Sequence, residues 1–494
     1  MFLNTQSNRK TPERFYSLLI IFFLLFLSIE LKANDISVKN VRLTGQVLDS
    51  HTFIKFDLNW KNSWRNSTNW DAAWLFVKYK VGNGNWLHAT LSTVAAEHII
   101  PEGSEISPSS DGKGVFIYRS SDGTGENNFN DISLRWNYPT DLVANDAQLT
   151  VKVFAIEMVY IPQGSFSVGD GVSTYRFHIA GDPLTPFTIT SENAIILNDT
   201  LTINPNPESL WATGAINKGT GQIPAAFPKG YNSFYIMKYE VTQGQYTEFL
   251  NMLTPDQCPQ RFDPLNSGQD RYTITGSYPL FTTNRPARAC NYLGYTDGAA
   301  YADWAALRPI TEFEFEKACR GTASVVPGEF AWGNTNYDRQ GDISGVEDGT
   351  ETVTDGLNIN CVVHFQNGDG GSGPLRSGIF AATLNTREGS GGTFYGVMEM
   401  SGNLYENVVS SGLTQSRSFQ GSNGDGVLSS NGNANNPDWP GYSGGEVISN
   451  SVSGGRGGGW NGGIDRHRIS DRYYSNSPAT RDYSNGMHLG RTAE

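Results

Sequence analysis

Four cysteines are the side chains in this sequence best suited to supply nucleophiles, disulfides or ligands for soft metals. Cys258, Cys290, Cys319 and Cys361 are widely spaced, form no CxxC pair and all lie in the second half of the 494-residue chain. A zinc site needs ligands in closer pairs, so this spacing disfavours zinc. Export of the protein would permit one or two disulfides, and the sequence leaves their pairing open.

Paired carboxylates and one serine motif are the other candidates for chemistry. The segment TEFEFEKACR at residues 311–320 places Glu312 and Glu316 on one face of a predicted helix, and paired carboxylates can do acid–base work. Because Lys317 and Arg320 are adjacent, we expect a solvated helix face instead. The sequence GYSGG at residues 441–445 matches a nucleophile elbow but lacks the preceding strand and following helix that such an elbow requires.

The first part of the chain has the pattern of half-buried antiparallel strands. Apolar residues alternate at a period of two in three segments: Phe56, Leu58 and Trp60; Ile132, Leu134 and Trp136; and Leu149, Val151 and Val153. Residues 74–81 and 86–91, joined by the turn GNGN, predict one hairpin of the same sheet. We therefore predict an N-terminal antiparallel β-sandwich over residues 34–156.

Residues 157–494 differ in composition, with short aromatic-rich segments, two predicted helices and long loops of Gly, Asn and Ser. The helices are expected near residues 242–253 and 311–320, and Thr311 with Glu314 forms the capping box of the second. Residues 421–459 are too poor in apolar side chains to build a core of their own and are predicted to be a surface loop. The chain as a whole is predicted to be α+β.

Charge and the first 33 residues bear on location and partners. The formal net charge is −13, which disfavours nucleic acid and anionic membrane surfaces as partners. Residues 1–33 combine a basic start, an apolar run over residues 18–27 and a small residue, Ala33, which is typical of a signal peptide. An uncleaved membrane anchor is the alternative, although the run is shorter than the roughly 20 residues of a spanning helix. We expect a secreted, periplasmic or cell-surface protein with no membrane span in the mature chain.

Seven segments in the second part resemble, in order, the formylglycine-generating-enzyme (sulfatase-modifying factor) family. They are MVYIPQGSF at 158–166, FYIMKYEVTQGQYTEF at 234–249, YADW at 301–304, RPITEFEFEKACRG at 308–321, FAWGN at 330–334, YGVMEMSGNLYE at 395–406 and RGGGW at 456–460. The fourth is similar to the family's Arg-Leu-Pro-Thr-Glu-x-Glu-Trp-Glu motif. The resemblance covers residues 157–494 and implies an α+β fold related to C-type lectins, with little regular secondary structure.

The resemblance also implies which residues the enzymes of this family need. Their oxidase chemistry uses two thiolates after the tryptophan of the last motif to bind copper(I), a soft metal that selects sulfur. Residues 457–474 contain no cysteine. A second branch of the family holds iron with His-x-x-x-His-x-Glu, a spacing that none of the seven histidines provides. We therefore expect no copper and no catalytic residues of either kind.

One motif implies a cation site. EMSGNLYE at residues 399–406 resembles the calcium loop of the family, and the ligands so implied are the carboxylates of Glu399 and Glu406 and the main-chain carbonyls of Gly402 and Leu404. Glu399 replaces a shorter side chain, and Asn407 stands where the family has Trp. The prediction is a structural Ca²⁺, and the alternative is a packed turn without an ion.

In the enzymes the closing segment forms the floor of the substrate groove. Here it is rich in Tyr, Asn and Ser, side chains that suit recognition because aromatic rings give stiff contact area and small polar groups give adaptable hydrogen bonds. Ordinary C-terminal packing is the alternative. The predicted ligand-binding residues are Trp460, Asn461, Asp465, His467, Arg472, Tyr473, Tyr474 and Tyr483.

The sequence thus predicts an exported, non-catalytic binding or structural protein with a protein or carbohydrate ligand at the cell surface. Two alternatives stay open: a metal-dependent oxidoreductase of the same family with relocated chemistry, and a cell-surface subunit of a secretion or gliding apparatus.

Overall fold

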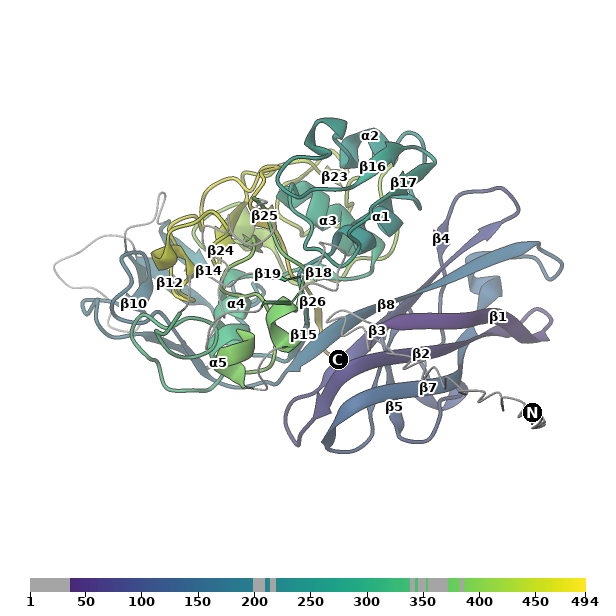
Figure 1. The fold of residues 1–494 in the computed structure, drawn as a ribbon, viewed down its shortest axis with the longest axis horizontal. Coiled ribbons are helices and arrows are strands. Elements are labelled where there is room, and N and C mark those ends of the chain that lie inside the picture. Colours follow the sequence, from purple (N-terminus) through teal and green to yellow (C-terminus); the bar gives the residue numbers. More distant parts are fainter. Residues whose placement is uncertain are drawn as a thin grey trace, which may run out of the picture. The chain divides into compact units, whose positions relative to one another are not determined.

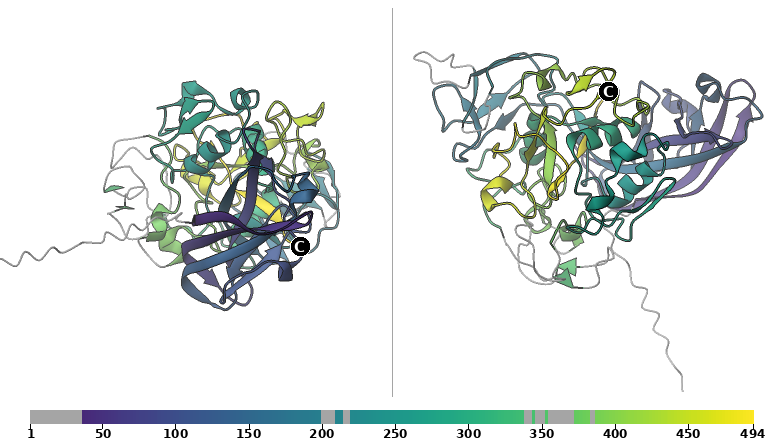
Figure 2. Two further views of the ribbon diagram at one scale, coloured as in Figure 1. Left: turned by 90° about the vertical axis from the view of Figure 1, so that its right-hand side faces the viewer. Right: turned by 90° about the horizontal axis from the view of Figure 1, so that it is seen from above.

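The computed structural model describes residues 36–198, 209–213, 219–337, 343–344, 352–353, 372–382 and 386–494. Many strands and a few short helices make up these residues, so the predicted α+β fold class is confirmed (Figures 1 and 2). The predicted signal peptide and Cys361 lie outside the described ranges. Within those ranges, no helix is long and apolar enough to cross a membrane.

The N-terminal part is a sandwich of two antiparallel sheets, as predicted. One sheet has the order β1 (Ser37–Val47), β2 (His51–Arg65), β7 (Gly123–Trp136). The other has the order β18 (Arg308–Pro309), β26 (Leu489–Thr492), β15 (Phe234–Met237), β8 (Leu149–Ile161), β3 (Asp71–Val81), β6 (Val115–Arg119), β5 (Ser104–Pro108), and β4 (Leu87–His88) pairs with β3. The alternating apolar residues of β2 and β7 pack against β3 and β6 to form the core between the sheets.

The second sheet belongs to both halves of the chain. Strand β8 pairs with β3 along residues 149–159 and then with β15 through residues 158–161, so it passes through the predicted domain boundary at residues 156 and 157. Alternate residues of β3 enter two different cores: Leu75 and Val77 face the sandwich, whereas Trp74 and Phe76 join the large core of the C-terminal part. All of the described residues belong to one compact unit.

Short elements complete the C-terminal part. The helices are α1 (Gln243–Leu250), α2 (Cys258–Arg261), α3 (Tyr295–Trp304), α4 (Glu312–Arg320) and α5 (Arg387–Ser390). One smaller sheet has the strand order β10 (Phe177–Ile179), β13 (Leu210–Ala212), β12 (Ile195–Asn198), β14 (Gly221–Ile223), and another has the order β24 (Ser453–Arg456), β21 (Tyr405–Val409), β25 (Asn485–Gly486). The remaining strands form pairs: β11 (Phe187–Ile189) with β9 (Phe166–Val168), β16 (Thr275–Ser277) with β17 (Leu280–Thr282), β19 (Ile343–Ser344) with β20 (Thr352–Val353), and β22 (Tyr442–Ser443) with β23 (Glu446–Val447).

The two predicted helices are confirmed as α1 and α4. Helix α4 begins with the predicted capping box, in which the Glu314 amide donates to the Thr311 hydroxyl and the Thr311 amide donates to the Glu314 carboxylate. The expected solvated face is wrong, because Glu312, Glu316, Lys317 and Arg320 are all completely buried. Arginines from the C-terminal segment pair with the two carboxylates and make that burial tolerable.

Two further expectations are modified. Residues 421–459 are not only a surface loop, since Trp439, Val447 and Val452 are buried in the large core. Cys258, Cys290 and Cys319 are buried free thiols, so the described part of the chain contains no disulfide.

Candidate functional site

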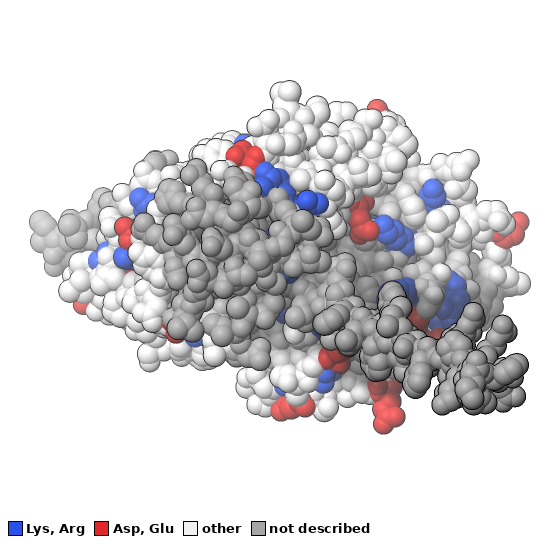
Figure 3. Space-filling model, in the orientation of Figure 1, with Lys and Arg blue, Asp and Glu red and all other residues white. Residues whose placement is uncertain are grey.

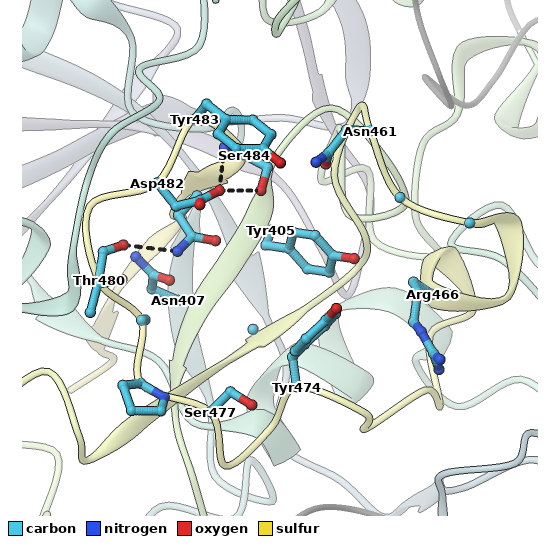
Figure 4. Close-up of a pocket in the computed structure, with 16 residues that line it drawn as sticks. Tyr405, Asn407, Asn461, Arg466, Tyr474, Ser477, Thr480, Asp482, Tyr483 and Ser484 are labelled. Atoms are coloured by element: carbon cyan, nitrogen blue, oxygen red, sulfur yellow. Dashed lines mark hydrogen bonds between the residues drawn. The ribbon is translucent and has the colours of Figure 1, made fainter. Parts of the chain in front are cut away.

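The C-terminal segment forms a pocket of about 410 Å³ over the small sheet of β24, β21 and β25 (Figure 4). This volume falls in the range of sites for small ligands. The pocket is lined by Tyr405, Asn407, Gly455, Asn461, Gly462, Gly463, Arg466, Tyr474, Ser477, Pro478, Ala479, Thr480, Asp482, Tyr483, Ser484 and Asn485. None of these described lining residues is a cysteine or a histidine.

Three tyrosines supply the aromatic surface of the pocket. Tyr405, from β21, packs edge to face on Tyr474 with ring centroids 5.3 Å apart. In Figure 4 the hydroxyls of both rings point toward the right of the view. Tyr483 packs on Trp460 at 5.6 Å, and the Trp460 indole N–H donates to the Tyr483 carbonyl at 3.0 Å. Tyr474 and Tyr483 are each 39% exposed although they line a concavity, so their rings can still contact a ligand.

Hydrogen bonds within the lining fix the loop over residues 480–485. Asp482 accepts from the amide and the hydroxyl of Ser484 at 3.0 and 2.7 Å, and the Asn485 side chain donates to the Thr480 carbonyl at 2.9 Å (Figure 4). Burial raises the pKa of the Tyr405 phenol, so this hydroxyl stays neutral at physiological pH. The walls are therefore held in place by the chain itself, which lowers the entropic cost of binding.

Arg466 is the charged group at one side of the pocket. Its guanidinium lies 3.8 Å from the centroid of the Tyr473 ring and forms an ion pair with Asp471 at 3.1 Å. Burial raises the pKa of Asp471 to about 6, against the opposing effect of Arg466. On the face drawn in Figure 3, basic and acidic side chains are interspersed among uncharged ones.

The structure places the eight predicted ligand-binding residues in different environments. Asn461, Tyr474 and Tyr483 line the pocket, and Trp460 supports Tyr483 from behind. Which of the eight contact a ligand stays a prediction. The other four do not line the pocket: Tyr473 lies against Arg466, Asp465 pairs with Arg468 at the surface, and His467 and Arg472 are completely buried.

Sequence reasoning missed several residues of the wall. Tyr405 and Asn407 belong to β21, which begins within the predicted calcium loop, and their spacing of two places both side chains on one face of that strand. The same alternation in the sequence could have identified them. Arg466 comes from a 3-10 helix of four residues, Ile464–His467, and Thr480 and Asp482 come from an irregular loop, so no periodic pattern identifies them.

The two carboxylates among the predicted calcium ligands, Glu399 and Glu406, are engaged in hydrogen bonds. Glu399 accepts from the Gly378 amide at 2.6 Å, and burial raises its pKa to about 7. Glu406 accepts from the His488 amide at 2.6 Å and pairs with His488 Nδ1 at 2.8 Å through its other oxygen. Next to them, burial and the charges of Glu406 and Glu399 raise the pKa of Glu240 well above its usual value.

This arrangement fits calcium poorly. Calcium takes six to eight oxygens, and both carboxylate oxygens of Glu406 already interact with His488. In the ranges that the structure describes, no group of three or more His, Cys, Asp or Glu side chains could hold a metal ion. These observations do not test the structural calcium predicted from the sequence, but the hydrogen bonds of Glu406 favour the alternative, a packed turn without an ion.

The ion is tested by thermal unfolding of EDTA-treated protein with and without added CaCl₂. Because His488 occupies the Glu406 carboxylate, we expect Tm to be unchanged by CaCl₂. If the site did bind calcium, a calcium concentration of 100 times Kd would raise the free energy of unfolding by about 2.7 kcal/mol. A calcium-dependent rise in Tm that disappears in Glu406→Gln would instead establish the predicted ligand set. Glu248→Gln, at an exposed glutamate, is the control for a general effect of lost charge.

Comparison with known proteins found one family. The model of the sulfatase-modifying factor enzyme 1-like domain matches residues 146–492, a range that includes the pocket and the buried carboxylates described above. No curated protein matches the chain.

Proposed function

The chain belongs to the sulfatase-modifying factor enzyme 1-like family, and from this premise we propose that it is an exported, non-catalytic binding protein whose ligand occupies the C-terminal pocket. The observation that carries the proposal is the composition of the pocket: three tyrosines, small polar side chains and the charged residues Arg466 and Asp482, with no cysteine or histidine among the described lining residues.

The lining argues against the chemistry of the family's enzymes. Copper(I) needs thiolate ligands, and among the described cysteines Cys258, Cys290 and Cys319 are all buried outside the pocket. Burial also raises the pKa of the Cys290 and Cys319 thiols well above the usual value, so neither is a ready nucleophile.

The lining favours recognition of a protein or carbohydrate at the cell surface. The exposed rings of Tyr474 and Tyr483 offer apolar contact area, while Asn461, Ser477 and Thr480 offer uncharged hydrogen-bonding groups. Export is supported by the basic and apolar pattern of residues 1–33. If the protein is instead a structural subunit of a cell-surface assembly, we propose that a neighbouring subunit docks in the same pocket.

Binding is tested with the labelled mature protein on a glycan array and on a peptide array, followed by calorimetry with the tightest binder. We expect Tyr474→Ala and Tyr483→Ala each to weaken that binding roughly tenfold or more, because truncating an aromatic anchor typically costs about 1.4 kcal/mol or more. Tyr442→Ala is the matched control, since Tyr442 is similarly exposed, at 37%, but does not line the pocket.

Three results would contradict the proposal. These are binding that is unchanged in both pocket variants, binding to neither array, and copper-dependent oxidation of a cysteine-containing peptide by the purified protein.

A further inference from the structure

Three buried side chains with complementary chemistry meet outside the pocket, on three neighbouring strands of the large sheet. Asp71 begins β3, Glu157 lies on β8 and Lys238 follows the last residue of β15, with β8 between the other two strands. Lys238 Nζ lies 3.0 Å from Glu157 Oε2 and 3.2 Å from Asp71 Oδ2. The side chains of Lys238, Asp71 and Glu157 are 4%, 0% and 1% exposed, so water has almost no access to the group.

Aromatic rings enclose this amine and its two carboxylates. The centroids of the Trp64 and Tyr239 rings lie 4.9 and 5.5 Å from Lys238 Nζ, and the Trp60 indole N–H donates to Asp71 Oδ2 at 3.1 Å. A proton that moves from the ammonium to a carboxylate leaves both groups uncharged, so a site without water lowers the cost of that transfer.

The carboxyl group of Asp71 is surrounded by hydrogen-bond donors in a way that suits nucleophilic attack on its carbon. The Ser63 hydroxyl and the Trp64 amide donate to Asp71 Oδ1 at 2.7 and 3.0 Å. Two donors aimed at one oxygen form the arrangement that stabilises negative charge on that oxygen in a tetrahedral intermediate. The other oxygen, Oδ2, is the one that faces Lys238.

We propose that Lys238 and Asp71 condense into an intramolecular amide bond, with Glu157 as the proton relay. Glu157 takes a proton from the ammonium and passes it to Oδ2 of Asp71, so that a free amine faces a neutral carboxyl group. The Nζ lone pair then attacks Cγ of Asp71, and the Nζ–Cγ bond forms while negative charge collects on Oδ1, near Ser63 and Trp64. Nζ gives a second proton to Oδ2, the Cγ–Oδ2 bond breaks, and Oδ2 leaves as water.

The reaction is balanced without any other reactant. One ammonium and one carboxylate give one amide and one molecule of water, and nothing is oxidised or reduced. The proximity of the groups replaces the activation that amide formation otherwise needs, since it makes the reaction intramolecular and keeps water out. Burial lowers the pKa of Lys238, but Glu157, Tyr239 and Asp71 together raise it well above its usual value, so the ion pair is the starting state.

Such a bond would join the sandwich to the C-terminal part of the chain. Asp71 and Lys238 are 167 residues apart in sequence, so the amide would close a long loop in the unfolded chain. Unlike a disulfide, it would persist under reducing conditions. A covalent link of this kind suits a protein exposed to proteases outside the cell.

Peptide mapping of the purified full chain under denaturing conditions tests the bond. Trypsin cannot cleave after an acylated lysine, so the expected product is peptide 66–78 joined to peptide 230–261, uncleaved at Lys238 and lighter than their sum by one water. Separate peptides 66–78, 230–238 and 239–261 at their sequence masses would overturn the proposal. A lysine linked to Glu157 instead would overturn the assignment of Asp71.

Two further measurements separate the reaction from simple ion pairing. Glu157→Gln should leave the two peptides unlinked, whereas Glu105→Gln, at a partly exposed glutamate paired with Arg65, should keep them linked. Because Glu157→Gln can also impair folding, a second experiment uses wild-type protein that has never folded, kept in denaturant and then refolded. Peptide mapping measures the amount of linked product over time. The linked product should be absent before refolding and accumulate afterwards, and its failure to accumulate in refolded protein would contradict the mechanism.

Discussion

Replacement of Glu312 by alanine is expected to lower the free energy of unfolding by about 3–5 kcal/mol, because it removes the carboxylate that pairs with the buried guanidinium of Arg472 and leaves Arg456 with Glu316 alone. Arg472 donates to Glu312 through Nε at 2.8 Å and Nη2 at 3.0 Å, and Arg456 donates through Nη1 at 3.2 Å. The Ser411 amide adds a bond at 2.8 Å. All three charged side chains are completely inaccessible to water.

Glu312 is ionised under ordinary conditions. Burial raises its pKa, but the Arg472 and Arg456 guanidiniums and their hydrogen bonds outweigh burial and hold the pKa below its usual value. A carboxyl with a depressed folded-state pKa contributes stability above its unfolded-state pKa and loses it only as the pH falls through the folded-state value. The effect of Glu312→Ala should therefore be fully present at neutral pH.

Urea unfolding followed by circular dichroism measures this loss. Glu248→Ala, which removes an exposed ion pair with Lys152, is the control and should cost less than about 1 kcal/mol. Glu312→Gln should fall between the two, since it keeps the shape and removes the charge. A loss below about 1 kcal/mol for Glu312→Ala would mean that the arginines find other partners.

Helix α4 shows where prediction from the sequence succeeds and where it stops. Its position and capping box follow from local spacing, because Thr311 and Glu314 interact within one turn. Its environment does not, because the arginines that pair with Glu312 lie 144 and 160 residues away. The local sequence of a helix face with Glu, Glu, Lys and Arg is the same whether its charged groups interact with water or with arginines distant in the sequence.

The sheet gives a similar contrast. The alternation in β2 and β7 predicts strands with one buried face, and both were found. The hairpin predicted over residues 74–91 was found as well, but its first strand, β3, is buried on both faces, which its nearly continuous apolar run could have indicated. The pairing of β8 with β15 had no local indication, because it joins residues from the two parts of the chain.

The family resemblance drew attention to the closing segment, and Asn461, Tyr474 and Tyr483 of that segment line a pocket, although which of the predicted residues bind a ligand stays a prediction. The resemblance could not show that His467 and Arg472 are completely buried. Side-chain direction in an irregular loop depends on contacts with the rest of the fold, which sequence spacing does not encode.

Trp74→Ala is expected to cost about 3–5 kcal/mol, the range for removing a large aromatic side chain from a core. Trp74 is completely buried on β3, its ring centroid lies 4.7 Å from that of Phe116, and its indole N–H donates to the Ala305 carbonyl at 2.9 Å. The Arg491 guanidinium lies 4.3 Å from its centroid. Truncation thus leaves a cavity, removes the hydrogen-bond donor of the Ala305 carbonyl and takes the aromatic ring away from the Arg491 guanidinium.

Urea unfolding of Trp74→Ala also tests whether the two cores unfold together. Because β3 contributes to both, the wild type should show one transition that is the same by circular dichroism and by tryptophan fluorescence. Trp86→Ala is the matched control: Trp86 is partly exposed and covered by Lys80, so its loss should cost about 1 kcal/mol or less. If Trp74→Ala instead separates the two signals while the total stability is preserved, the sandwich folds independently and the shared strand does not couple it to the pocket-bearing part.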